Sequence, residues 1–418
     1  MKKGNFRYVS WLCTFFMVMG SMMGSAGKVY AAESGQQYGP GDPKPAALSE
    51  ELKGVWISYL IWNQLPKEQG AFQAAVDQMF DNCRSWGMNA VFVHVRSHGD
   101  AMYQSYIFPW SKFSGGNPGY DPLAYMIESA HARGLKFHAW INPYRITGYL
   151  MSWDDVSPDS PAKKWLADGD SSNDRYVLSH DNAYYYNPSI EEVKRLVVDG
   201  VMEVVRGYNI DGIHFDDYFY PALDDQSESR WFDKPEYMAS GSGDTIVQWR
   251  RNQVSDLIRR VYQAIKTEKP QVQFGISPQG YVEHLKSDSN LFVDIDWWMS
   301  QDGFMDYIMP QLYWGFETKT ASGEAAPYAF EQNLNTWIEL KRKGNVTLYL
   351  GLGLYKAGAD VKDYNEVSEW LRRDDIISRE VSAGRNSGEV GGYCFYSYDS
   401  FLQPVAQREV EHLLPLLR

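Results

Sequence analysis

Two adjacent carboxylic acids, Asp216 and Asp217, end a short apolar stretch, and hydrolytic chemistry often uses such a pair. Residues two apart in a strand share a face, so His214 and Asp216 lie opposite Phe215. When a glycosidic bond is hydrolysed, one carboxyl group protonates the leaving oxygen and another attacks the sugar or activates water. Adjacent acids also repel each other, which raises one pKa. The stretch therefore predicts Asp216 as nucleophile or principal carboxylate, with Asp217 as its partner.

Polar and amphipathic side chains also end other apolar stretches and are of the kind that line a pocket. The group that we expect to shape a substrate subsite consists of His214, Arg96, Asp100, Asn142, Tyr144, Gln311 and Tyr313. Arg96 could hold Asp216 ionised or bind an acidic substrate group. A pairing of Arg96 with Asp100 inside their own loop is equally compatible with the sequence.

The same residues leave three questions open: whether the site binds a metal, which residue is the second acid, and whether the barrel is catalytic. His94, His138 and His214 could bind a metal with Asp216, as in a metal-dependent hydrolase or deacetylase. We favour histidines that hydrogen-bond the acids and sugar hydroxyls, because the sequence has no His-x-His pair, and we expect no metal and no cofactor. The second acid stays open between Asp100, Asp217, Glu283, Glu317 and Asp399. A barrel that binds carbohydrate without cleaving it is the alternative to an enzyme.

The elements that must position these residues alternate between short apolar runs and longer helical patterns. The predicted strands are 54–60, 90–96, 136–144, 210–218, 273–279, 306–314, 347–355 and 391–398. The predicted helices are 71–86, 122–133, 189–207, 245–268, 291–300, 327–343, 365–383 and 404–416. This alternation predicts an α/β fold, a (β/α)₈ TIM barrel with long βα loops. An open doubly wound sheet is the alternative, but residues 58–62 lack its glycine-rich phosphate loop.

Two long insertions are predicted beside the barrel mouth. Residues 147–186 show no helix or strand period and are acidic, and residues 221–243 are similar. Loops of this length in a compact domain are usually functional, so we expect lids or cleft walls.

The residues before the barrel predict the cellular compartment of the protein. Residues 1–32 combine basic residues, an apolar run and small residues before Ala32, which predicts a cleaved signal peptide. Residues 33–51 read as a disordered linker before the domain at 52–418. We therefore expect an exported protein at the cell surface or in the periplasm, with no stable membrane insertion after cleavage.

The net charge restricts the class of binding partner. The formal net charge of −13 argues against nucleic-acid binding. We expect a polysaccharide partner, and the sequence leaves the oligomeric state open. Cys83 and Cys394 are predicted as buried thiols.

Ordered motifs from about Leu52 to the end resemble the glycosyl hydrolase-like 10 family, which includes divisome-associated and cell-surface lipoprotein members. The motifs are Gly54–Trp56, Gly99–Tyr103, Tyr120–Leu123, Ala130–Leu135, His138–Arg145, Asn187–Pro188, Asp211–Tyr218 and Pro310–Trp314. The resemblance implies a TIM barrel acting on polysaccharide, and in one branch the cleavage of peptidoglycan glycan strands without stem peptides. The fourth strand also resembles a chitinase signature, but Tyr218 stands where that signature has its acid.

Overall fold

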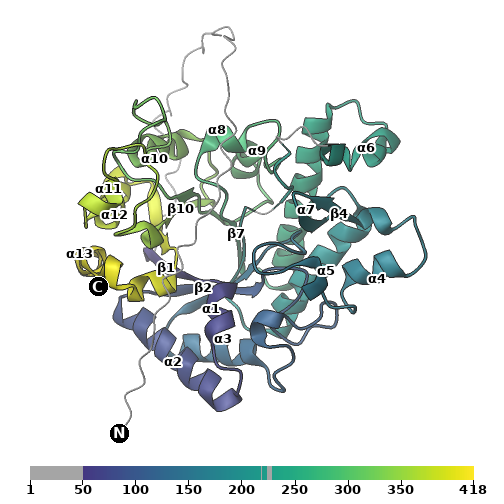
Figure 1. Cartoon of the computed structure of the whole chain (residues 1–418), viewed down its shortest axis with the longest axis horizontal. Helices are drawn as coiled ribbons and strands as arrows, with labels where there is room; N and C mark the ends of the chain where they lie inside the picture. Colours follow the sequence, from purple (N-terminus) through teal and green to yellow (C-terminus); the bar gives the residue numbers. More distant parts are fainter. Residues whose placement is uncertain (1–49, 218, 224–227) are drawn as a thin grey trace. The chain divides into compact units, whose positions relative to one another are not determined.

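Nine parallel strands form the sheet of the computed structural model, which describes residues 50–217, 219–223 and 228–418. The strands are β1 (Leu52–Ile57), β2 (Ala90–Arg96), β3 (Lys136–Ile141), β6 (Gly212–Phe215), β7 (Gln273–Ile276), β8 (Tyr307–Ile308), β9 (Gln311–Leu312), β10 (Thr347–Leu352) and β11 (Val390–Phe395). The order β11-β1-β2-β3-β6-β7-β8-β10 closes through the pairing of β10 with β11. The predicted (β/α)₈ barrel is confirmed (Figure 1). The predicted signal peptide, Tyr218 and nearly all of the predicted linker lie outside the described residues.

The sixth predicted strand is interrupted. Its two parts, β8 and β9, are two residues long each and both pair with β10. Pro310 lies between them, and a proline has no N–H for the ladder. The segment that carries Gln311 is therefore held between β10 and the residues after β7, where Gln311 forms a bridge with Gln279.

Helices cover the outside of the sheet, as the alternation predicts (Figure 1). They are α2 (Gln69–Ser85), α3 (Pro122–Ala132), α5 (Glu191–Gly207), α7 (Ile246–Glu268), α9 (Ile295–Ser300), α10 (Phe330–Glu339), α11 (Glu369–Arg372), α12 (Ile376–Ser387) and α13 (Gln407–Leu417), with the shorter α1 (Tyr59–Gln64) and α8 (Val282–Leu285). The single helix predicted at 365–383 is two helices, α11 and α12. Thr245 caps α7 by accepting the N–H of Gln248, whereas Ser189 lies before the start of α5 and its hydroxyl donates to Asn187.

Two apolar clusters stabilise the barrel. The larger one lies between strands and helices and takes the outward residues of β2, Val91, Val93 and Val95. The smaller one includes Trp56 and Phe92 and lies inside the barrel. Both faces of the strands are therefore buried, as expected of a parallel sheet covered by helices.

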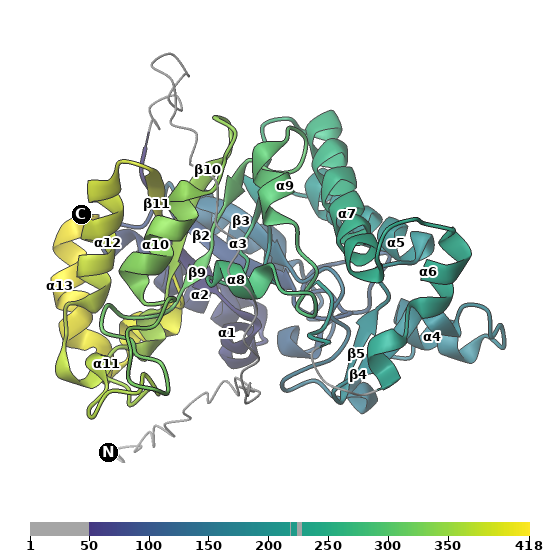
Figure 2. The ribbon, with the colours of Figure 1, turned by 90° about the horizontal axis from the view of Figure 1, so that it is seen from above.

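The two insertions contain regular structure, which corrects the prediction that residues 147–186 lack it. That segment forms α4 (Pro161–Ala167) and an antiparallel hairpin of β4 (Val177–His180) and β5 (Ala183–Tyr186). The second insertion forms α6 (Lys234–Ser240), which lies beside the hairpin and α4 in Figure 2. An ion pair of 2.5 Å between Arg175 and Glu236 joins the two insertions.

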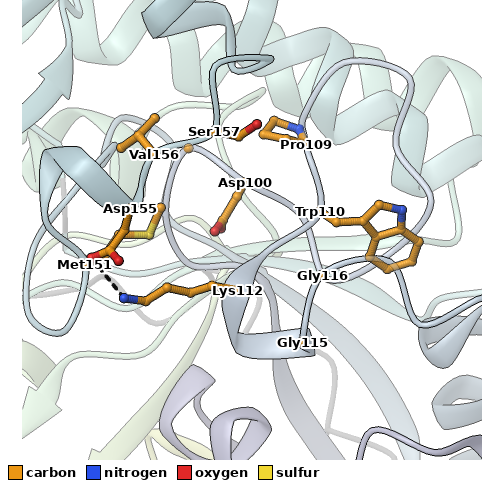
Figure 3. A pocket seen from close by; sticks show the side chains of 11 residues that line it. Asp100, Pro109, Trp110, Lys112, Gly115, Gly116, Met151, Asp155, Val156 and Ser157 are labelled. Carbon is orange, nitrogen blue, oxygen red and sulfur yellow. Dashed lines mark ion pairs between the residues drawn. The ribbon is translucent and has the colours of Figure 1, made fainter.

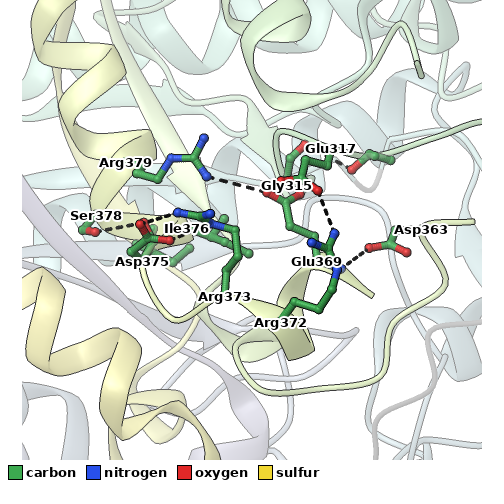
Figure 4. A network of polar contacts seen from close by, with 12 residues as sticks. Gly315, Glu317, Asp363, Glu369, Arg372, Arg373, Asp375, Ile376, Ser378 and Arg379 are labelled. Carbon is green, nitrogen blue, oxygen red and sulfur yellow. Dashed lines mark hydrogen bonds and ion pairs between the residues drawn. The ribbon is translucent and has the colours of Figure 1, made fainter. Parts of the chain in front are cut away.

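A polar network holds the loop after β9 against α11 (Figure 4). The Glu369 carboxylate accepts the Glu317 N–H at 2.8 Å, and Glu317 itself pairs with Arg372 at 2.7 Å. Asp363 accepts the N–H of Glu369 at 2.7 Å. A β-carbon on Gly315 would lie 2.1 Å from the Glu369 carboxylate, so a larger residue there would displace this carboxylate from the network.

Cys83 and Cys394 are buried free thiols, as predicted. Among the helices in the described ranges, none has both the length and the apolar character needed to cross a membrane.

We predict that Gly212→Ala destabilises the barrel by about 1–3 kcal/mol or more, as overpacking does. A β-carbon there would lie 2.2 Å from Nδ1 of the His138 ring, which is itself buried and cannot easily move aside. Gly207→Ala, at the end of α5, is the matched control because nothing lies within 4 Å of its β-carbon. Urea unfolding of both variants measures the difference, and equal midpoints would contradict the predicted clash.

Candidate active site

Asp216 and Asp217 follow the last residue of β6, Phe215, at the carboxyl end of the barrel. The strand ends before them, so alternation no longer forces one of them outward. Asp216 is 3% exposed, and Asp217 is partly exposed. Burial raises the pKa of Asp217 to about 6, opposed by the Arg145 charge and a hydrogen bond with Gln279. The chain thus places a carboxyl group that is protonated in mildly acidic solution next to a second, buried carboxyl group.

Arg145 is the cation of this site, and it is not among the residues predicted from the sequence. Its Nε donates to the Ser97 carbonyl at 2.9 Å, and its guanidinium lies 5.5 Å from the centre of the Tyr59 ring. The charge lowers the pKa of both Asp217 and Asp100. Its position shortly after β3, in the motif that ends Asn142-Pro-Tyr-Arg, was the available signal.

His94 and Asn142 form a buried pair beside Arg145. The Tyr59 N–H donates to Nδ1 of His94 at 3.2 Å, which leaves the proton on Nε2 to donate to Asn142 Oδ1 at 3.4 Å. Trp140 stacks on the imidazole with ring centres 3.3 Å apart. Burial lowers the pKa of His94 well below its usual value. A neutral His94 therefore orients Asn142, which is 1% exposed.

His214 takes part in a hydrogen-bond chain inside the barrel. The Trp56 indole N–H donates to His214 Nε2 at 3.1 Å, so Nδ1 carries the proton and donates to the Tyr307 hydroxyl at 3.1 Å. That hydroxyl then donates to His138 Nδ1 at 3.2 Å. His214 has no exposed surface, and burial lowers its pKa well below its usual value. The prediction that His214 contacts substrate is therefore corrected. Both ring nitrogens bond to other side chains of the barrel interior, Trp56 and Tyr307.

Arg96 points away from the acids. The pairing of β2 with β3 shifts between His94 and Arg96, and this bulge reverses the alternation on which the inward prediction depended. The guanidinium packs over the Phe108 ring at 4.1 Å and against Gly200 of α5. Its charge lowers the pKa of Asp100, but less than the charge of Arg145 does. The predicted pairing of Arg96 with Asp216 is therefore wrong.

Tyr144 also faces outward. The residue is buried, and burial with the nearby Asp256 charge on α7 raises its pKa well above the usual value. Strand β3 ends at Ile141, three residues earlier, so strand parity does not extend to Tyr144. Tyr144 packs under α7 and is not placed to bind substrate.

Gln311 and Tyr313 do lie beside the acids. Gln311 donates to the Ser277 carbonyl at 3.1 Å and remains partly exposed. Burial raises the pKa of Tyr313 well above its usual value, and the Asp217 charge adds to that rise. The centre of the Tyr313 ring lies 5.8 Å from that of Tyr355 and 6.0 Å from that of Tyr396. These tyrosines extend the aromatic lining of the mouth beyond the residues predicted from sequence.

The other candidates for the second acid differ from Asp217. Glu283 is exposed on α8, and Glu317 is paired with Arg372. The hydroxyl of Ser397 donates to Asp399. Burial raises the pKa of Asp100 to about 6, opposed by a hydrogen bond from Ser111 and the charge of Arg145. Burial therefore raises the pKa of Asp100 as it raises that of Asp217.

Among the described residues, no group of three or more His, Cys, Asp and Glu side chains is arranged to hold a metal ion. The geometry of His94 and His214 agrees with this, because each ring contacts protein partners through both nitrogens.

Residues 51–369 match the family model described as glycosyl hydrolase-like 10. The chain belongs to this family. It is 35% identical over 379 residues to glycosyl hydrolase YngK of Bacillus subtilis, covering 84% of this chain and 69% of the relative. It is 30% identical over 417 residues to glycosyl hydrolase DigH of Escherichia coli K12, covering 90% of each. The resemblance found in the sequence is confirmed, and membership supports a glycosidase activity for the chain.

Solved structures share the fold of this family member. The glycoside hydrolase domain of PgaB (BpsB) from Bordetella bronchiseptica matches with a TM-score of 0.57 and 12% identity, over 87% of this chain and 99% of that one. The catalytic domain of a β-amylase from Paenibacillus polymyxa matches with a TM-score of 0.57 and 10% identity, over 89% and 100%. At such identities the likeness shows the TIM-barrel fold alone.

We predict that Tyr307→Phe destabilises the protein by about 2–4 kcal/mol, because it leaves the buried nitrogens of His214 and His138 without a partner. Tyr106→Phe is the matched control, since Tyr106 is 93% exposed. The free energy of unfolding in urea measures both. A loss below 0.5 kcal/mol, roughly the size of a surface substitution, would contradict the proposed chain.

Proposed function

We propose that this chain is an exported glycoside hydrolase that cleaves peptide-free glycan strands of peptidoglycan, with Asp216 as nucleophile or principal carboxylate. The observation that carries the proposal is the pair of acids at the end of β6, of which Asp217 has a pKa of about 6. The family supports the glycosidase activity. The substrate and the export are proposed from the sequence resemblance and from residues 1–32.

The two acids would divide the chemistry between them. Asp217 is the proton donor, because a carboxyl group that holds its proton near pH 6 can protonate a leaving oxygen. Asp216 supplies the carboxylate that attacks the anomeric carbon or activates water. After the bond breaks, the proton of Asp217 leaves with the released sugar hydroxyl. If Asp216 has attacked the sugar, Asp217 then takes a proton from the water that displaces it. If Asp216 has activated the water instead, Asp216 holds that proton and both groups return to their starting states by proton exchange with solvent.

The residues around the acids tune and orient this pair. Arg145 keeps the pKa of Asp217 from rising further and stabilises negative charge in the mouth. Gln279 bonds to Asp217 and also accepts the Asn290 side-chain N–H at 3.2 Å, which fixes its orientation. Gln311 and Tyr313, which lie beside the acids, present polar groups to sugar hydroxyls.

We expect wild-type protein to release glycan fragments from amidase-treated, peptide-free peptidoglycan, and Asp216→Asn to lose about a thousandfold or more of that activity. Intact peptidoglycan and chitin oligomers are digested beside it, with products identified by mass spectrometry. Glu283→Gln, an exposed acid on α8, is the matched control and should keep full activity. Full activity of Asp216→Asn would remove Asp216 from the mechanism.

Asp217→Asn should slow cleavage of the natural glycan by about 10²–10⁴-fold, because the leaving oxygen is no longer protonated. Cleavage of an aryl glycoside with an acidic phenol should change far less, since that leaving group needs no proton. Comparable losses on both substrates would assign Asp217 a different role. Steady-state kinetics on the two substrates measures the contrast.

The activity of wild-type protein should fall as the pH rises through about 6, because Asp217 must be protonated to act as the acid. Arg145 lowers that pKa, so Arg145→Gln should raise it and move the falling limb to higher pH. Arg133→Gln is the control, as Arg133 pairs with Asp77 and Asp81 on the outside of the barrel. A limb that stays in place in Arg145→Gln contradicts the electrostatic role.

A further inference from the structure

A second pocket lies beside the active site, between the loop after β2 and the first insertion (Figure 3). Its volume of 350 Å³ falls in the range of about 300–1,000 Å³ that is usual for small-molecule sites. Gly115 and Gly116 form part of its wall, and Met151 and Val156 supply apolar surface. The pocket therefore has room and a mixed lining suited to one ring of a larger ligand.

One buried polar atom in this pocket has no partner within the described part of the chain. Asp100 is 3% exposed, and its Oδ1 makes no hydrogen bond there, while Ser111 donates to the carboxylate. Figure 3 shows the Asp100 side chain between the Lys112–Asp155 ion pair and Trp110. An unpaired buried carboxylate oxygen costs free energy, which a hydroxyl or amide donor of a ligand would recover.

The neighbouring side chains define what that ligand can be. Lys112 pairs with Asp155 at 3.0 Å, so these two charges balance. Lys112, the one cation among the described residues that line the pocket, is therefore neutralised, and Asp100 offers no positive charge in either protonation state, so the lining has nothing to pair with a ligand carboxylate. Trp110 is half-buried, lines the pocket and offers a flat apolar face of the kind on which the ring of a sugar packs.

Arg145 connects this pocket to the acids. Its charge lowers the pKa of both Asp100 and Asp217, so it lies close enough to act on both. Its Nε also donates to the Ser97 carbonyl, three residues before Asp100, which places the pocket loop next to the segment that carries Arg145.

We propose that the pocket lined by Asp100 and Trp110 is a distal sugar subsite that takes an uncharged pyranose of the glycan, away from the bond that is cleaved. In a peptide-free strand of peptidoglycan, that residue is N-acetylglucosamine, because N-acetylmuramic acid without its peptide carries a carboxylate. Asp100 accepts a hydrogen bond from a hydroxyl or the acetamido N–H, and Trp110 packs on the ring. This inference rests on the proposed function, and it deepens that function by naming the sugar at one position.

The test is direct binding of N-acetylglucosamine oligomers of increasing length to the Asp216→Asn protein, measured by calorimetry. Affinity should rise at the length that first reaches the pocket. Adding Asp100→Asn or Trp110→Ala should remove that rise, roughly tenfold in Kd, and leave the affinity for shorter oligomers unchanged. Trp297→Ala is the matched control, since Trp297 is 50% exposed on α9.

The two pocket variants keep the result decisive if one of them fails to fold. Equal weakening for short and long oligomers, or no rise with length in the parent protein, overturns the subsite. A length-dependent rise that both pocket variants retain also overturns it. If the rise depends on Asp100 and Trp110 but the wild type cleaves no glycan, the hydrolase proposal fails and the subsite stands.

Discussion

The site depends on one directional chain of hydrogen bonds inside the barrel, which runs from Trp56 through His214 and Tyr307 to His138. The Trp56 indole N–H fixes the tautomer of His214, and the Tyr307 hydroxyl accepts from His214 and donates to His138. Because His214 belongs to β6, these hydrogen bonds also fix the position of that strand along the barrel axis. Asp216 follows His214 by two residues, so the placement of both acids depends on packing inside the barrel.

Burial then sets the chemistry of the mouth. Withdrawal from water raises the pKa of Asp217 and of Asp100, and the same guanidinium, Arg145, opposes both shifts. One cation therefore couples the two carboxyl groups, and a change in its position alters both. Its own place is fixed by the Ser97 carbonyl and the Tyr59 ring, which come from the segments that follow β2 and β1.

Periodicity predicted the barrel well because the signals it uses, the side-chain alternation along strands and the succession of short apolar runs and helical patterns, are local. The position of Asp216 at the end of β6 followed from the same reasoning. Arg96 and Tyr144 were misplaced because parity was carried through a bulge and past the end of β3, and neither break has a signature in the residue types. The role of Arg145 depends on contacts between loops distant in sequence, which no local pattern contains.

The two insertions are connected to each other beside the barrel. The ion pair between Arg175 and Glu236 joins one insertion to the other, not to the strands that bear the acids. Helix α4, the β4–β5 hairpin and α6 thus form one wall beside the barrel. The hairpin is also bonded to the segment after β3, because the Tyr186 N–H donates to the Tyr144 carbonyl at 2.8 Å and Arg145 forms a β-bridge with Tyr185. A change in the hairpin therefore reaches the backbone that positions Arg145, and through the charge of Arg145 the pKa of Asp217. The wall thus belongs to the electrostatic surroundings of the acids, although it lies outside the barrel sheet.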